Sequence, residues 1–97
     1  NQAAHRLGLD TQLSATDFDN DDTFVGEGYG LPSPEGLNAL RTLARTEGIL
    51  LDPVYTSKVL AGLLAHVADG RLNGEAIFLH TGGNPALFAY AEDVHAE

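Results

Sequence analysis

The sequence contains no cysteine, which excludes disulfide bonds and thiolate metal sites. Basic residues are also scarce, with five lysine and arginine residues against 14 aspartate and glutamate residues and a net charge of −9. Nucleic acids and anionic membranes are bound by positive patches, so we expect neither as a partner. No apolar run approaches the roughly 20 residues that span a bilayer. What remains is 97 residues, 43% of them hydrophobic, enough for one small domain with a core.

Two helices are predicted in the middle of the chain. Ser33 is a typical N-cap and precedes Pro34, so we predict a helix that starts there and ends at Gly48. A second apolar stripe at helical spacing predicts a helix over 56–69, which Gly70 ends.

The other segments are shorter and more polar. We expect the end of a helix at 2–8, an acidic loop at 10–23, short strands at 23–25 and 76–80, a turn at 81–83, a short helix at 84–90 and a frayed tail at 91–97. The buried-type strand AIFLH (76–80) needs neighbouring strands to form a sheet. No signal peptide is visible. The chain begins with Asn1 rather than Met, which suggests a processed chain or a fragment, and the lone strand favours a fragment.

The segment RTEGILLDPVYTSK (45–58) places Tyr55 and Thr56 at the start of the second predicted helix. A phenol and a hydroxyl at a helix N-terminus are suited to proton transfer and anion contact. The alternative is a buried tyrosine followed by an N-cap threonine. Tyr29, on the glycine-rich loop 26–30, is a second candidate, and its alternative is plain aromatic packing beside flexible glycines.

The turn after the predicted strand is a third candidate. Thr81, Gly82 and Gly83 follow the strand and precede a helix, where ligands bind in open α/β sheets. The Thr81 hydroxyl could contact a ring nitrogen or an anion there. The alternative is a structural turn that uses glycine for its geometry.

Lysine and metal chemistry are weakly supported. Lys58 needs a desolvated site to act as a nucleophile, and its position in the first turn of an amphipathic helix favours a solvated or salt-bridging role. The run DFDNDD (17–22) resembles the start of a calcium loop but has Asp22 where the loop needs glycine and Gly28 where it needs glutamate. The four histidines lack paired ligand spacing, so no metal site is predicted.

The blocks GYGLPSPEGLNALRTLARTEGILLDPVYTSKVLAGLL (28–64) and FLHTGGNPALFAY (78–90) resemble the C-terminal part of the D-cysteine desulfhydrase and 1-aminocyclopropane-1-carboxylate deaminase family. These are pyridoxal-phosphate enzymes of fold type II, the tryptophan-synthase-β type. The resemblance implies that residues 1–97 form the C-terminal part of a large cofactor-binding domain of three-layer αβα architecture. It covers about the last third of a family enzyme.

The resemblance also implies roles for individual residues. Tyr29 matches a substrate-contacting tyrosine, and Tyr55 matches a tyrosine of the acid–base machinery. Thr81, with Gly82 beside it, matches a position that approaches the pyridine nitrogen of pyridoxal phosphate. Thr56 stands where the deaminases have glutamate and the desulfhydrases have threonine. A neutral hydroxyl leaves the electron sink weaker, which suits β-elimination, whose leaving group takes the electrons.

We therefore expect a pyridoxal-phosphate-dependent lyase that releases hydrogen sulfide from D-cysteine. L-Cysteate sulfo-lyase and deaminase activity are the alternatives, and a non-catalytic interaction segment is an alternative of another class. The cofactor-binding lysine and phosphate loop of the family lie outside these residues, so the chain alone should neither hold the cofactor covalently nor catalyse. We expect the complete enzyme to be a cytoplasmic homodimer that acts on a small amino acid.

Overall fold

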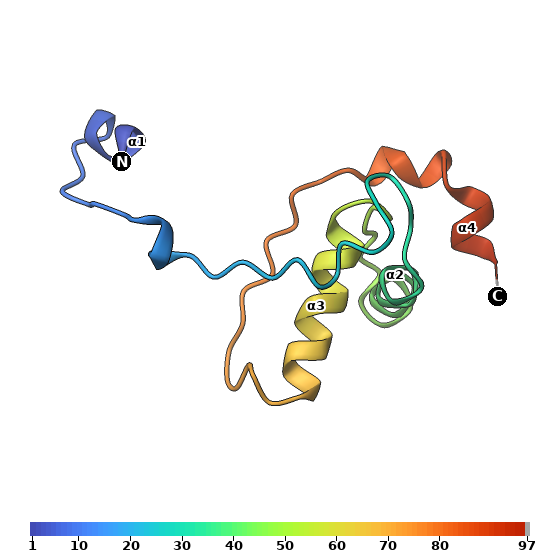
Figure 1. Ribbon diagram of the computed structural model, residues 1–97. Coiled ribbons are helices and arrows are strands. Elements are labelled where there is room, and N and C mark those ends of the chain that lie inside the picture. The colour runs from blue at the N-terminus through green and yellow to red at the C-terminus, as the bar shows by residue number, and fades with distance from the viewer. Residues whose placement is uncertain (97) are drawn as a thin grey trace.

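The computed structural model of the protein describes residues 1–96. Its elements are α1 (Gln2–Arg6), the 3₁₀-helix η1 (Ala15–Asp17), α2 (Pro34–Glu47), α3 (Thr56–Ala68), the 3₁₀-helix η2 (Asn84–Phe88) and α4 (Ala91–His95). α2 and α3 pack against each other at the centre, and α4 contacts α2 (Figure 1). The N-terminal segment, blue in Figure 1, reaches away from this helical body, so the molecule measures 50 × 31 × 27 Å.

The predicted start and end of α2 are confirmed. The Ser33 hydroxyl accepts a hydrogen bond of 3.1 Å from the Gly36 amide, and Pro34 occupies the first turn. At the other end Gly48 adopts the left-handed conformation with φ of 67° and donates its amide to the Ala44 carbonyl. Glycine is favoured at this position because it has no Cβ to strain.

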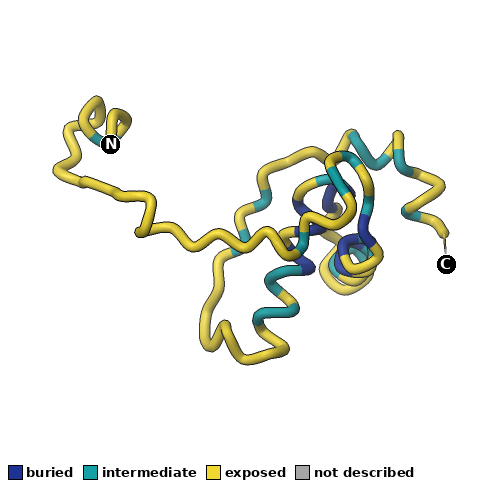
Figure 2. Tube along the Cα trace, viewed as in Figure 1, coloured by how far each residue is buried: buried dark blue, intermediate teal, exposed yellow. Residues whose placement is uncertain are grey.

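α3 agrees with its prediction to within one residue, since it ends at Ala68 with Asp69 as its C-cap. Helices α2 and α3, with the link between them, enclose a small core, dark blue in Figure 2. Its members are Ala39, Leu40, Leu51, Leu60 and Ala61. Burying a leucine side chain contributes about 1.5–3 kcal/mol, so this cluster is the main apolar stabilisation of the helix pair.

The predicted strands are not formed. No strand occurs within residues 1–96, and both 23–25 and 76–80 lie outside regular structure. In the second segment Ile77 is 97% exposed and Leu79 is 76% exposed. A strand needs a hydrogen-bonded neighbour, and the described residues supply none for this segment. The three-layer αβα arrangement is accordingly not formed by this chain itself.

The C-terminal segment is more ordered than predicted. The expected helix at 84–90 is the 3₁₀-helix η2, and the tail expected to fray forms α4 as far as His95. Arg41 of α2 holds α4 by donating to the backbone carbonyls of Asp93, Val94 and Ala96 at 2.8, 2.9 and 2.6 Å. These bonds satisfy carbonyls at a helix end that otherwise lack partners. Residue 97 of the predicted tail lies outside the described residues.

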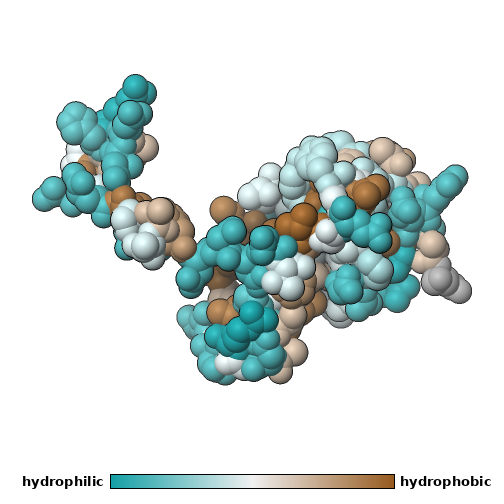
Figure 3. Space-filling view, in the orientation of Figure 1, coloured by the Kyte–Doolittle hydropathy of each residue, from teal (hydrophilic) through white to brown (hydrophobic). Residues whose placement is uncertain are grey.

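Apolar side chains are exposed on the helical body and gather over its middle, brown in Figure 3. The largest fractions belong to Ile77, Phe88, Tyr29 and Leu79. None of the helices within residues 1–96 combines the length and the apolar character that crossing a bilayer requires.

Candidate active site

The start of α3 is organised by a buried aspartate that sequence reasoning did not single out. Asp52 is 1% exposed, and its carboxylate accepts the backbone amides of Val54, Tyr55 and Thr56 at 2.8, 2.7 and 2.9 Å. Burial acts to raise the pKa of Asp52, but the bonds from Thr56, Tyr55 and Val54 outweigh it and lower the pKa. The carboxylate therefore stays charged at the positive end of the helix dipole. The Asp-Pro pair before the helix was the signal available in the sequence.

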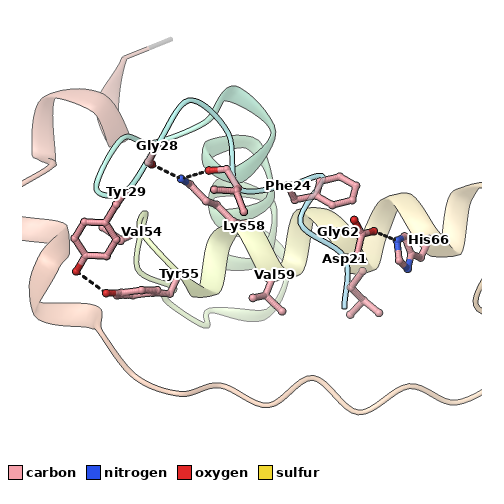
Figure 4. A pocket seen from close by; sticks show the side chains of 12 residues that line it. Asp21, Phe24, Gly28, Tyr29, Val54, Tyr55, Lys58, Val59, Gly62 and His66 are labelled. Carbon is pink, nitrogen blue, oxygen red and sulfur yellow. Dashed lines mark hydrogen bonds and ion pairs between the residues drawn. The ribbon is translucent and has the colours of Figure 1, made fainter. Parts of the chain in front are cut away.

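The structure brings Tyr29 and Tyr55 together although they are 26 positions apart in sequence. Their phenol oxygens lie 2.6 Å apart in a hydrogen bond, and their rings meet edge to face with centroids 5.9 Å apart (Figure 4). Tyr29 is 82% exposed and Tyr55 is 53% exposed, so both rings face solvent. The bond with Tyr29, then partial burial and the charge of Asp52, raise the pKa of Tyr55.

Thr56 lies next to this pair but turns inward. Its side chain is 2% exposed, and its hydroxyl donates to Asp52 Oδ1 at 2.6 Å and accepts the Asp52 amide at 2.9 Å. The hydroxyl of Thr56 is therefore committed within the chain. A cofactor-binding role for Thr56 stays a prediction.

Lys58 departs from the sequence prediction. It is 8% exposed, and within the described residues its ammonium makes no ion pair. Instead Nζ donates to the carbonyls of Val25 at 2.6 Å and Gly28 at 3.3 Å (Figure 4). The prediction of a solvated or salt-bridging lysine is wrong, because the glycine-rich loop folds over the first turn of α3 and covers it.

An open pocket of about 540 Å³ runs along this side of α3. Phe24, Val54, Val59 and Leu63 give it apolar walls, and the tyrosine pair closes one end (Figure 4). At the other end His66 Nε2 lies 2.7 Å from Asp21 Oδ2.

Asp21 tethers the acidic loop to α3 through this contact. Hydrogen bonds from Thr23, and then from His66, hold the pKa of Asp21 at about 2. Asp21 is therefore ionised at neutral pH, and its carboxylate also lies 3.8 Å from Arg71 Nη1.

The turn at 81–83 lies against the start of α3. His80 Nε2 donates to the Leu50 carbonyl at 2.8 Å, and the Gly82 amide donates to His80 Nδ1 at 3.0 Å. These partners require a neutral imidazole protonated on Nε2. A Cβ on Gly83, whose φ is 92°, would lie only 2.9 Å from Asp52 Cγ, so the turn touches the aspartate that caps α3. Thr81 is exposed on this turn.

The sequence profile described as "Pyridoxal-phosphate dependent enzyme" matches residues 1–82. The chain belongs to that family. The crystal structure of an ACC deaminase homologue is 33% identical, with a TM-score of 0.78 over 96% of this chain. Both findings confirm the resemblance drawn from GYGLP, DPVYTSK and HTGG, and the family's cofactor is pyridoxal phosphate.

The chain spans 27% of the length of that homologue. Thr81 is exposed on the turn whose Gly83 lies against Asp52 at the start of α3, and its cofactor-binding role stays a prediction. Lys58, the only lysine in the sequence, does not fit as the covalent attachment point because its Nζ is buried against two carbonyls. The Gly82 amide is likewise engaged by His80.

Proposed function

We propose that this chain provides the substrate-facing wall of a pyridoxal-phosphate-dependent lyase that acts on a sulfur-containing amino acid. The reaction is α,β-elimination, in which D-cysteine and water yield pyruvate, ammonia and hydrogen sulfide. The observation that carries this proposal is the bond of 2.6 Å between the phenols of Tyr29 and Tyr55 at the start of α3. Two coupled, solvent-facing phenols form a short relay for one proton.

Pyridoxal phosphate, when bound, supplies the electron sink for removal of the α-proton. Tyr55 supplies the proton that the departing thiolate needs, and Tyr29, bonded to it, contacts the substrate. Because the pKa of Tyr55 is raised, the phenol is protonated and ready to donate across the neutral range. Thr81 lies on the turn beside this helix end, where its hydroxyl can orient a ring nitrogen.

Thr56 supports elimination over cyclopropane opening. Where the deaminases carry glutamate, this chain has a neutral hydroxyl that is buried and bonded to Asp52. No carboxylate from position 56 is available to keep a pyridine nitrogen protonated. The similarity to an ACC deaminase homologue favours the deaminase reaction as the second candidate.

The test is a set of three assays on the complete protein supplied with pyridoxal phosphate. Hydrogen sulfide from D-cysteine is the expected product, whereas sulfite from L-cysteate or 2-oxobutanoate from 1-aminocyclopropane-1-carboxylate would replace the proposal with one of its alternatives. Absence of turnover with all three substrates would remove the lyase proposal and leave the non-catalytic interaction segment as the remaining hypothesis. Tyr55→Phe should lower kcat by about 100-fold or more, the usual contribution of a general acid.

Thr46→Val is the control. It removes an exposed hydroxyl on α2 that donates to the Thr42 carbonyl at 3.0 Å and makes no bond to the tyrosine pair or to the loop that carries Tyr29. It should reduce kcat far less than Tyr55→Phe. Equal losses in the two variants would argue against proton donation by Tyr55.

A further inference from the structure

Lys58 is a buried charged group that the proposed reaction does not use. Desolvating an ammonium is costly unless its hydrogen bonds are met. Here no carboxylate pairs with it among the described residues, and the compensation comes from two backbone carbonyls, those of Val25 and Gly28. This arrangement lacks the charge–charge stabilisation of an ion pair. Its specific effect is to fix the geometry of the groups that Lys58 joins.

The two carbonyls lie on the loop that carries Tyr29. Gly28 directly precedes Tyr29, so the bond from Lys58 Nζ fixes the peptide unit from which the phenol projects. Gly26 in the same loop has φ of 76°, a backbone conformation that glycine adopts without strain. This glycine lets the loop turn so that its carbonyls face the ammonium.

Lys58 also belongs to the helix that carries Tyr55. It lies three residues after Tyr55, about one helical turn along the chain. Its stem packs against α2, since a Cβ added to Gly36 would lie 3.4 Å from Lys58 Cγ. Asp52 fixes the backbone of Tyr55 itself through its amide. One lysine therefore ties the loop of one phenol to the helix of the other.

We propose that Lys58 is a positioning residue that sets the distance between the Tyr29 and Tyr55 phenols. It touches neither substrate nor cofactor and acts only through the glycine-rich loop. The significance of this role for catalysis rests on the function proposed above, but the geometry does not.

The test compares Lys58→Met with the unchanged complete protein. Methionine keeps most of the apolar stem and removes the donor. Tyrosine ¹³Cζ resonances are followed by NMR against pH, with Tyr29→Phe and Tyr55→Phe used for assignment. We expect the raised pKa of Tyr55 to return toward its ordinary value of about 10 as the phenols separate. In the lyase assay kcat should fall by about 100-fold with KM changed much less, the usual cost of a misplacement near 1 Å.

Lys58→Arg, which keeps a cationic donor, should restore the Tyr55 titration in part. Val67→Ala, a change at an exposed residue further along the same helix, is the control and should leave the titration unchanged. An unaltered Tyr55 pKa in folded Lys58→Met overturns the proposal. Should Lys58→Met fail to fold, Lys58→Leu decides in the same way, since it also removes the donor and leaves an apolar side chain.

The two proposals fail separately. Loss of the Tyr55 shift in a protein that turns over none of the three substrates supports positioning by Lys58 and removes the lyase proposal. An active lyase whose phenols titrate identically with and without the Lys58 ammonium keeps the function and removes the positioning role.

Discussion

The start of α3 and the segment 76–80 show how differently two stretches of one chain are determined. At the start of α3, Asp52 accepts four hydrogen bonds from residues within four positions of itself. In the segment 76–80, Ile77 and Leu79 expose most of their surface. Local side chain to backbone bonds need nothing from elsewhere in a protein, whereas strand residues need neighbours.

This difference determines which parts of the candidate site are fixed by bonds between residues close in sequence. Tyr55 lies on the self-sufficient side, where Asp52 accepts its amide, and Tyr29 reaches Tyr55 through the glycine-rich loop, whose carbonyls accept from Lys58. The turn that carries Thr81 follows the exposed segment and contacts the start of α3 through His80 and Gly83. We therefore expect substitutions on the α3 side to disturb the site most.

The largest effect is expected for Asp52→Ala. It leaves three backbone amides and the Thr56 hydroxyl without their acceptor, and an unsatisfied buried group costs about 1–3 kcal/mol. We expect the free energy of unfolding of the complete protein to fall by about 3 kcal/mol or more in urea titrations.

The pH dependence of Asp52→Ala gives a second check. The folded pKa of Asp52 is lowered, so its stabilisation is present above the unfolded value of about 3.9 and is lost as the pH falls through the folded value. The loss caused by Asp52→Ala should therefore shrink below that unfolded pKa. Asp69→Ala, at the exposed far end of α3, is the control and should cost at most about 0.5 kcal/mol. Equal losses at the two ends would remove the distinction between them.

Much of the helical structure was predictable because its signals are local. Ser33, Pro34 and Gly48 mark α2 by capping chemistry that depends only on neighbouring residues. Tyr29 and Tyr55 were each identified, but their contact depends on how the glycine-rich loop folds back, and no spacing encodes it. Lys58 was misjudged for the same reason, since the loop that buries it begins more than 25 positions earlier.

The prediction of a strand at 76–80 was wrong for a different reason. Its apolar composition, with Ile77 and Phe78, suits burial in a sheet, but pairing partners decide whether a strand forms. The order of α4 escaped prediction because it depends on Arg41, about 50 positions earlier, whose guanidinium reaches the helix end.

A smaller effect is expected at Gly83, where the two regions touch. Gly83→Ala places a side chain on a backbone with φ of 92° and adds a Cβ that would lie 2.9 Å from Asp52 Cγ. Gly74→Ala is the matched control, with φ of 96° and nothing within 4 Å of its Cβ. Both variants carry the backbone strain, so only Gly83→Ala should carry the added cost of overpacking, about 1–3 kcal/mol. Equal urea midpoints for the two would mean that the turn can move away from Asp52 freely.

The smallest effect is expected at Ser57. This residue of α3 tests the effect of burial apart from that of hydrogen bonding. Ser57 is fully buried, and its hydroxyl has no hydrogen-bond partner among the described residues, unlike those of Thr56 and Ser33. Removing an unpartnered buried hydroxyl forfeits no bond, so Ser57→Ala should leave the free energy of unfolding unchanged or raise it by about 1 kcal/mol. Ser33→Ala, which removes the cap of α2, should instead cost about 1 kcal/mol. A clear loss of stability in Ser57→Ala would show that this hydroxyl has a partner in the complete protein, and that the start of α3 is less self-sufficient than its bonds within this chain indicate.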